Sequence, residues 1–146
     1  MSNNMKIKNI TVLGGIGLNL EEYPFSEPIS DPVRFLFIGR LLAEKGIHEF
    51  IKAAQIVKQH YPLVEFIVLG GIDEANPGGI SKDALTSFTK QGLIIYPGYV
   101  ADVTEWIKRS SVFVLPSSYR EGLPRSTQEA MSVGRPIITT NVTGCR

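Results

Sequence analysis

The chain has 146 residues, of which 43% are hydrophobic, which is enough for one globular domain with a buried core. Its 15 basic and 14 acidic residues nearly cancel, which excludes the broad positive surface that nucleic-acid binding needs. A single cysteine, Cys145, excludes an internal disulfide and favours a reducing, cytoplasmic setting, and no apolar run approaches the roughly 18 residues of a membrane span, which leaves peripheral membrane contact open.

Residues 1–32 are predicted to form a linker that enters the domain, and residues 33–146 to form the domain itself. The glycines between Val12 and Leu20 resemble part of a dinucleotide-binding loop. That loop must be followed by a helix, however, whereas here the glycines run into acidic sequence broken by prolines. The segment is therefore interpreted as a linker and not as a dinucleotide site.

Short apolar runs alternate with helical patterns from Val33 onward. The runs predicted as strands are residues 33–39, 64–70, 93–96, 112–116 and 136–140. The patterns predicted as helices begin at Ile47, Ser81, Asp102 and Pro124. Buried runs of this kind are typical of parallel strands joined by right-handed helical crossovers. The sequence therefore predicts an open, doubly wound, parallel α/β sheet of the Rossmann-like type, with strand order 3-2-1-4-5.

Local signals predict the helix boundaries. The helix from Ile47 has apolar residues at helical spacing and ends before Pro62. Asp102 and Glu105 have the spacing of a capping box, which would start the third helix. Pro124 suits the first position of the fourth helix, because its missing N–H is not needed there.

The predicted topology reverses between the first and fourth strands, and ligands of such sheets bind outside the carboxyl ends of the strands at that point. The first strand ends at Gly39, which is followed by Arg40 and then by Lys45. Arg40 can bind a phosphate through its planar fork of donors, and Lys45 adds a compact charge. Alternatively, both are solvated surface cations, although cations beside a helix N-terminus are mildly unfavourable unless an anion joins them.

The fourth strand leads into residues 116–134, which hold two glutamates, Glu121 and Glu129, with seven residues between them. The helix that begins at Pro124 offers free N–H groups and the positive end of its dipole to an anion such as a phosphate. Glu129 can then accept hydrogen bonds from the hydroxyls of a ribose, and Glu121 from those of a second sugar. Alternatively, both are ordinary surface glutamates near a helix start.

Other catalytic and metal motifs are missing from the sequence. It has no D-x-D pair and no Walker loop, and His48 and His60 lack the spacing of metal ligands. His48 is expected on a helix surface. Neutralising a diphosphate would then fall to Arg40, Lys45 and the helix dipole, with Arg125 as a further candidate, so neither a metal nor another cofactor is expected.

Three stretches carry a resemblance to a known family: G-R-L-L-A-E-K-G at 39–46, G-Y-V-A-D at 98–102, and residues 114–140 with an E-x7-E motif in a G-L-P context. Together they resemble the nucleotide-sugar-binding C-terminal domain of retaining glycosyltransferases of the GT-B fold, family four, also called glycosyl transferases group 1. The resemblance extends from Val12 to Arg146 and implies that the chain is the C-terminal half of such a protein.

The resemblance also implies which residues bind the donor, a nucleoside diphosphate sugar. Arg40 and Lys45 would hold the diphosphate beside Gly39, and Glu129 would bind the ribose. The residues implied around the transferred sugar and the base are Glu121, Gly122, Leu123, Pro124, Tyr99 and Val100. Arg40, Lys45 and Glu121 would be catalytic, since stabilising the departing diphosphate lowers the barrier most.

In extent the chain departs from the family. The N-terminal acceptor-binding domain is missing, and residues 14–22 resemble the hinge between the two domains. The family also continues into another helix and a sixth strand, so we interpret the chain as a fragment that transfers no sugar alone. Residues 136–141 would then form an exposed edge strand suited to self-association.

The function implied by the resemblance is metal-independent, retaining transfer of a sugar, for example from a UDP-sugar, to an acceptor hydroxyl. The acceptor would be a glycan or a lipid-linked glycan, bound through the N-terminal domain. The setting would be polysaccharide biosynthesis in the cytoplasm or at the cytoplasmic membrane face. Two alternatives remain: a noncatalytic module that binds a nucleotide sugar or phosphate, and a GT-B epimerase or phosphorylase relative.

Overall fold

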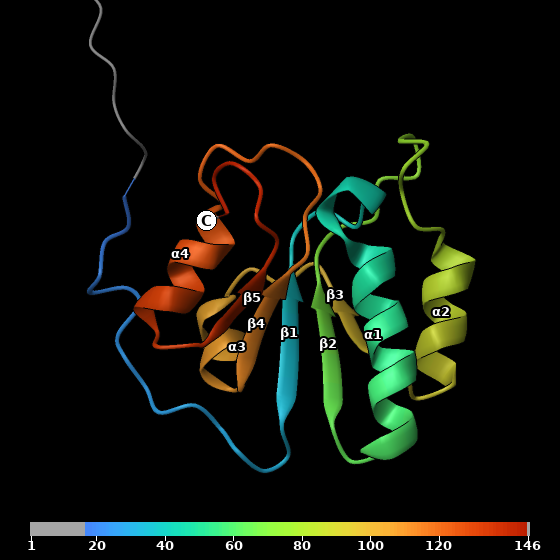
Figure 1. Ribbon diagram of the computed structural model, residues 1–146, viewed down its shortest axis with the longest axis horizontal. Helices are drawn as coiled ribbons and strands as arrows, with labels where there is room; N and C mark the ends of the chain where they lie inside the picture. Colours follow the sequence, from blue (N-terminus) through green and yellow to red (C-terminus); the bar gives the residue numbers. More distant parts are fainter. Residues whose placement is uncertain (1–16, 146) are drawn as a thin grey trace, which may run out of the picture.

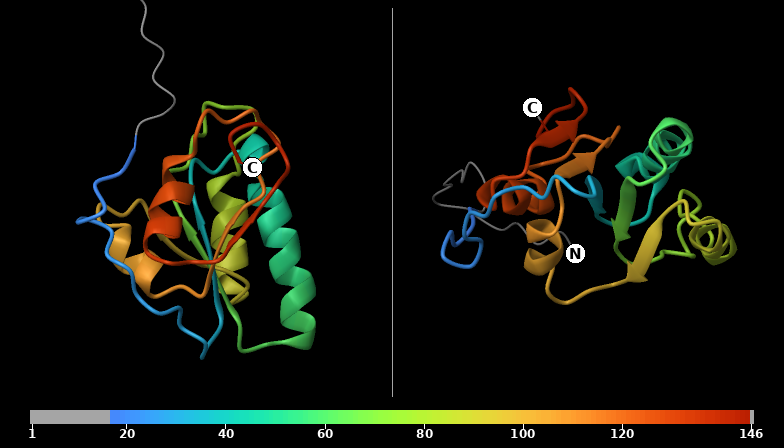
Figure 2. Two further views of the ribbon diagram at one scale, coloured as in Figure 1. Left: turned by 60° about the vertical axis from the view of Figure 1, so that its left-hand side comes forward. Right: turned by 90° about the horizontal axis from the view of Figure 1, so that it is seen from below.

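The computed structural model describes residues 17–145, which form a parallel sheet with order β3-β2-β1-β4-β5 (Figure 1). The strands are β1 (Arg34–Ile38), β2 (Glu65–Leu69), β3 (Ile95–Gly98), β4 (Val112–Leu115) and β5 (Ile137–Thr139). The helices are η1 (Ala43–Lys45), α1 (Ile47–His60), α2 (Lys82–Lys90), α3 (Thr104–Lys108) and α4 (Arg125–Ser132). Helices α1 and α2 cover one face of the sheet, and α3 and α4 cover the other (Figure 2). The predicted open, doubly wound α/β fold and its strand order are confirmed.

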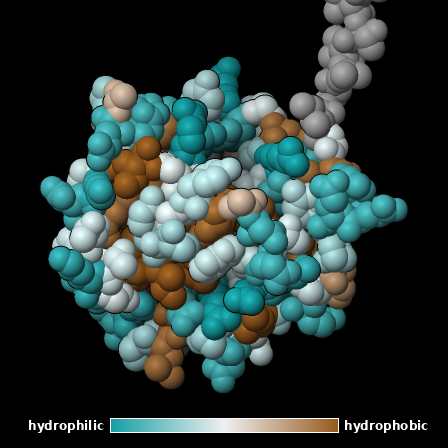
Figure 3. All heavy atoms as spheres, turned by 180° about the vertical axis from the view of Figure 1, so that it is seen from behind, coloured by the Kyte–Doolittle hydropathy of each residue, from teal (hydrophilic) through white to brown (hydrophobic). Residues whose placement is uncertain are grey.

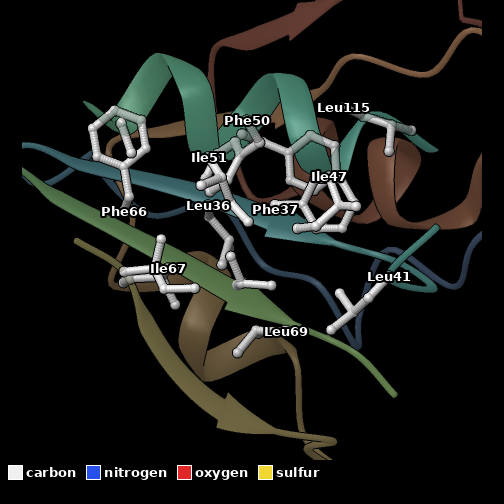
Figure 4. Close-up of a cluster of buried hydrophobic side chains, with 14 of the residues drawn as sticks. Leu36, Phe37, Leu41, Ile47, Phe50, Ile51, Phe66, Ile67, Leu69 and Leu115 are labelled. Carbon is white, nitrogen blue, oxygen red and sulfur yellow. The ribbon is translucent and has the colours of Figure 1, made fainter. Parts of the chain in front are cut away.

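The core is densest where α1 packs on the two central strands. Figure 4 shows Ile47, Phe50 and Ile51 of α1 pointing toward the phenylalanine rings of β1 and β2. The ring of Phe50 lies 5.6 Å from that of Phe37 and 5.3 Å from that of Phe66, centroid to centroid. Burying each of these side chains stabilises the fold by roughly 1.5–3 kcal/mol. The apolar stripe predicted for this helix is therefore the face that holds it on the sheet.

The segment before β1 lies against α4 (Figures 1 and 2). The hydroxyl of Ser132 donates to the carbonyl of Tyr23 at 2.9 Å, and the backbone N–H of Ser26 donates to the carbonyl of Val133 at 3.1 Å. Residues 17–32, predicted as a linker, are thus fastened to the domain along much of their length. The part of that segment before residue 17, with most of the glycine-rich stretch, lies outside the described residues.

Arg135 is the buried centre of this attachment, with a relative exposure of only 3%. Its guanidinium donates to the carbonyl oxygens of Ser110 at 2.8 Å, Val133 at 3.1 Å, Glu27 at 3.3 Å and Ser26. Burial lowers the pKa of this guanidinium from its ordinary value, and the negative charge of Glu27 opposes the shift. Arg135 thereby joins the segment before β1 to the C-terminal ends of α3 and α4.

Strand β3 departs from its predicted bounds. It covers Ile95–Gly98 instead of residues 93–96 and so includes Pro97. A proline is tolerated because β3 is an edge of the sheet, where a missing N–H costs no ladder bond. The carbonyl of Gly98 accepts a hydrogen bond from the N–H of Gly70 at 3.2 Å, which extends the pairing past the proline.

Two predicted helix starts are also wrong. The carboxylate of Asp102 accepts from the N–H of Thr104 at 3.0 Å, two residues on, while Glu105 pairs with Lys108 at 2.9 Å. No reciprocal capping box forms there, and α3 begins at Thr104. Helix α4 begins one residue after Pro124, which is the N-cap with an extended ψ of 118°.

Strand β5 forms the other edge of the sheet, and it pairs only with β4 among the described residues. Its central residue, Ile138, is 52% exposed. On the side opposite to that of Figure 1, apolar side chains form several separate groups between polar ones (Figure 3). Within residues 17–145, no helix is both long and apolar enough to cross a lipid bilayer.

Candidate functional site

The loops after β1 and β4 meet at the carboxyl ends of the strands, which point upward in Figure 1. The N–H of Ser118 donates to the carbonyl of Glu44 at 2.9 Å and joins the two loops. Gly46 has a positive φ of 83°, and a Cβ atom there would overlap the carbonyl oxygen of Pro116. A glycine at this position is therefore what allows the two loops to lie so close together. This contact is located at the predicted topological switch point.

A cavity of about 360 Å³, here called the β1–β4 cavity, opens between these loops. Its lining residues are Ile38, Gly39, Arg40, Lys45, Leu115, Glu121, Leu123, Pro124, Arg125 and Ser126. It brings together the residues predicted after the first strand and those predicted before the fourth helix. Gly122 lies in the same turn without lining the cavity.

A second cavity of about 310 Å³ shares Gly39 and Arg40 with the first and continues toward β2 and β3. Tyr99 and Val100 line it, so the structure places all four of these predicted residues around one crevice. The sequence interpretation missed Gly70 and other residues of this wall. The run V-L-G-G at 68–71, where the second strand ends, could have indicated it, because that strand neighbours the first.

Lys45 and Glu121 contact each other directly across the β1–β4 cavity. The ammonium of Lys45 lies 2.5 Å and 2.7 Å from the two carboxylate oxygens of Glu121, and the hydroxyl of Ser117 donates to the same carboxylate at 2.8 Å. The side chains are 18% and 9% exposed, so they are neither a solvated lysine nor a surface glutamate. Lys45 ends η1, and the left-handed Gly46 separates it from α1.

Arg40 has a different environment from Lys45. Its side chain is 62% exposed, and its nearest carboxylate contact is a 3.8 Å approach to Glu44. Since an exposed pair at this distance holds a side chain weakly, Arg40 can turn into either cavity. The crevice therefore combines one fixed cation with one that can adjust to an anion.

Glu129 is buried at 6% exposure, but it is not among the residues that line the β1–β4 cavity. Its Oε1 atom accepts a hydrogen bond from the hydroxyl of Tyr23 at 3.0 Å and another from Nε of Arg125 at 2.9 Å. The neighbouring Tyr23 hydroxyl, and after it the hydrogen bond and negative charge of Glu129, raise the pKa of the Arg125 guanidinium above its ordinary value. Arg125 thus stands between the carboxylate and the cavity.

The free end of α4 supplies a further anion-binding feature. Its N-cap is Pro124, whose side chain has no acceptor that could cap the first N–H groups of the helix. Arg125 and Ser126, in the first turn, line the β1–β4 cavity. Unsatisfied N–H groups and a positive helix end favour an anion at this position.

The remaining candidates from the sequence lie outside the crevice. His48 is exposed on α1, as expected. Within the described part of the chain, no three His, Cys, Asp or Glu side chains gather in a way that could hold a metal ion. The cavities are instead surrounded by basic groups, one carboxylate, backbone and apolar side chains.

Comparison with known proteins identifies the family of the chain. The family model for glycosyl transferases group 1 matches residues 32–146. A relative from Campylobacter jejuni, N,N'-diacetylbacillosaminyl-diphospho-undecaprenol alpha-1,3-N-acetylgalactosaminyltransferase, is 33% identical over 97% of this chain. The chain spans 39% of the length of that relative.

Solved structures have the same fold. The C-terminal domain of LpcC, a glycosyl transferase group 1 family protein from Francisella tularensis, is 25% identical with a TM-score of 0.71, over 88% of this chain and 72% of that one. HepE from Anabaena, solved in complex with UDP, is 23% identical with a TM-score of 0.71, over 88% of this chain and 38% of that one. The chain therefore belongs to the glycosyl transferases group 1 family, and its fold is that of the C-terminal domain of a GT-B glycosyltransferase.

Proposed function

We propose that this domain binds the nucleoside diphosphate sugar from which a GT-B glycosyltransferase transfers a sugar to an acceptor hydroxyl. The observation that carries the proposal is the β1–β4 cavity, which joins Arg40, Lys45 and the N-terminus of α4 with the carboxylate of Glu121. Cations and a helix end suit a diphosphate, and a carboxylate suits sugar hydroxyls. The UDP bound to HepE supports the assignment, because that protein has the same fold.

The two cavities suggest how the donor lies. The second cavity has apolar walls beside Tyr99 and Val100, which fit a planar base. The diphosphate would lie at Arg40 and Lys45, where the cavities meet. Glu129 would accept hydrogen bonds from the ribose once Arg125, whose side chain is 69% exposed, moves aside.

Transfer would break the bond between the anomeric carbon and a diphosphate oxygen, which keeps the electron pair. The acceptor oxygen would bond to the anomeric carbon on the same face, and its proton would pass to the departing phosphate oxygen. Lys45 and Arg40 would stabilise the negative charge that develops on that oxygen, so no metal ion is needed. Glu121 would orient the sugar through its hydroxyls while remaining paired with Lys45.

The acceptor is proposed to be a growing glycan carried by a membrane lipid, in polysaccharide biosynthesis at the cytoplasmic membrane face. The named acceptor of the Campylobacter jejuni relative, a sugar on diphospho-undecaprenol, supports this class. The family resemblance assigns the acceptor site to a separate domain. We therefore expect the chain alone to bind the donor and to transfer no sugar, since orienting the acceptor is a large part of catalysis.

Calorimetric titration of UDP and GDP into the chain tests the proposal. At least one of them should bind equally well with EDTA and with Mg²⁺, and more weakly at about 0.3 M than at about 0.05 M salt, because salt screens Arg40 and Lys45. Uridine and guanosine, which lack phosphates, provide the control and should show little salt dependence. Failure of both diphosphates to bind would overturn the proposed function, whereas loss of binding with EDTA would overturn the metal independence.

A further inference from the structure

Tyr23 joins the segment before β1 to a residue of the proposed donor site. Its hydroxyl donates to Oε1 of Glu129 at 3.0 Å, across 106 positions of sequence. Both residues are buried, with exposures of 7% and 6%. A buried carboxylate needs hydrogen-bond donors, and Tyr23 supplies one from outside α4.

The position of Tyr23 does not depend on its hydroxyl. The carbonyl of Tyr23 accepts a hydrogen bond from Ser132 at 2.9 Å. Two residues along the chain, the ring of Phe25 lies so close to Gly134 that a Cβ atom there would overlap it. These contacts fasten the segment at Tyr23 itself and two residues after it, so removing the phenolic oxygen alone should leave the ring in place.

The contacts at Glu129 are unevenly distributed between its two oxygens. Tyr23 and Arg125 both donate to Oε1, at 3.0 Å and 2.9 Å. Two donors on one oxygen fix the rotation of the carboxylate and leave Oε2 to other partners. Arg125 is largely exposed and can leave, whereas Tyr23 is buried and cannot. Tyr23 is thus the donor that still holds the carboxylate when Arg125 turns toward a phosphate.

We propose that Tyr23 is a positioning residue of the donor site, which holds Glu129 so that Oε2 faces the ribose hydroxyls. The inference rests on the proposed function, in which Glu129 accepts hydrogen bonds from the ribose hydroxyls. It adds that the segment before β1 takes part in nucleotide binding although it contacts no nucleotide. Tyr23 acts only through Glu129, and its effect is confined to ligands that carry a ribose.

Tyr23→Phe tests this, with Tyr61→Phe as the matched control because Tyr61 is exposed at the far end of α1. In calorimetry with UDP and GDP, Tyr23→Phe should lower the affinity for whichever diphosphate the parent binds by about three- to tenfold, as expected for one hydrogen bond. Pyrophosphate, which lacks a ribose, should bind within about twofold of the parent. Tyr61→Phe should change neither affinity.

A Glu129→Ala background, which removes the oxygen that Tyr23 contacts, separates positioning from general loosening of the fold. If Tyr23 acts through the carboxylate, adding Tyr23→Phe to Glu129→Ala should weaken nucleotide binding no further. Equal losses for nucleotide and pyrophosphate, or a full Tyr23→Phe effect in the Glu129→Ala background, would overturn the inference. A parent chain that binds pyrophosphate but neither nucleotide would instead overturn the proposed function on which it rests.

Hydrogen exchange gives a second readout, because coupling between two sites is reciprocal. If docking of Tyr23 strengthens nucleotide binding, the nucleotide must strengthen docking by the same factor. The N–H of Ser26, which donates to Val133 at 3.1 Å, reports on that docking. Saturating nucleotide should slow its exchange about three- to tenfold in the parent and not in Tyr23→Phe. Equal slowing in both proteins would contradict the inference.

Discussion

The ammonium of Lys45 lies within 2.7 Å of both carboxylate oxygens of Glu121, so a loop after β1 and a loop after β4 are joined by one largely buried ion pair. Among the described residues, the ion-pair partner of each charge lies 76 positions away in sequence. Both residues also line the proposed donor site. A substitution at either of them should therefore change the stability of the fold as well as ligand binding.

Removing one member of this pair should lower the stability of the fold more than removing both members. Lys45→Met leaves the Glu121 carboxylate buried without its cation and should lower the free energy of unfolding by about 3 kcal/mol. The double variant Lys45→Met/Glu121→Gln should lose less than the sum of the single changes. Urea unfolding measures all three.

The exposed pair of Arg40 and Glu44 is the control for that cycle. It is 62% and 43% exposed at a separation of 3.8 Å, so Arg40→Met should cost less than about 1 kcal/mol. Additive losses at Lys45 and Glu121 would show that their contact contributes nothing to the fold.

The two glutamates should differ in which ligand they affect. Glu129→Ala should weaken nucleoside diphosphate and nucleotide sugar alike by about 1.5–3 kcal/mol, the range for a hydrogen bond to a charged group. Glu121→Ala should weaken the nucleotide sugar while leaving the nucleoside diphosphate nearly unchanged or slightly tighter. Calorimetry with both ligands gives the pattern, at a temperature where circular dichroism shows that each variant is folded. Equal losses for both ligands in Glu121→Ala would contradict the assignment.

Gly46→Ala should destabilise the chain by about 3 kcal/mol or more, because the left-handed backbone strains alanine and its Cβ would overlap Pro116. Gly92→Ala is the matched control: Gly92 also has a positive φ, of 67°, but open space surrounds it. It should cost only about 1 kcal/mol. Thermal unfolding of both variants checks the difference, and similar melting temperatures would rule out a tight contact between the loops.

The edge formed by β5 should promote self-association at high protein concentration, since its outer backbone groups can pair with another strand. Ile138→Lys should reduce the association, because a lysine on an edge strand opposes pairing. Met131→Lys adds the same charge at a residue of α4 that is 62% exposed, and should have little effect. Sedimentation velocity over a concentration series distinguishes the variants. A parent chain that stays monomeric throughout would contradict this prediction.

The sheet could be predicted from sequence because its information is local. The strands are short apolar runs, and the stripe of α1 that includes Phe50 repeats at helical spacing. The usual strand order of such sheets then predicts that the loop with Arg40 lies beside the loop with Glu121. Helix starts were less predictable, because they depend on which backbone N–H a side chain binds, as at Asp102.

The environment of Glu129 could not be predicted in this way. Its partner Tyr23 lies in a segment without periodic pattern, and no local rule connects residues 106 positions apart. The pairing of Lys45 with Glu121 could not be predicted from the sequence for a related reason. Topology brings the two loops together, but only side-chain packing decides that the two charges bind each other before they meet any ligand.

The buried guanidinium of Arg135 also limits where a pivot can lie. Its bonds to the carbonyls of Ser26 and Glu27 make that backbone part of the same rigid body as β5 and α4. Lifting the segment away would break these two hydrogen bonds to a charged group, each worth about 1.5–3 kcal/mol. We therefore expect that, in a two-domain protein of this family, movement between the domains would carry Tyr23 and the donor crevice together as one unit.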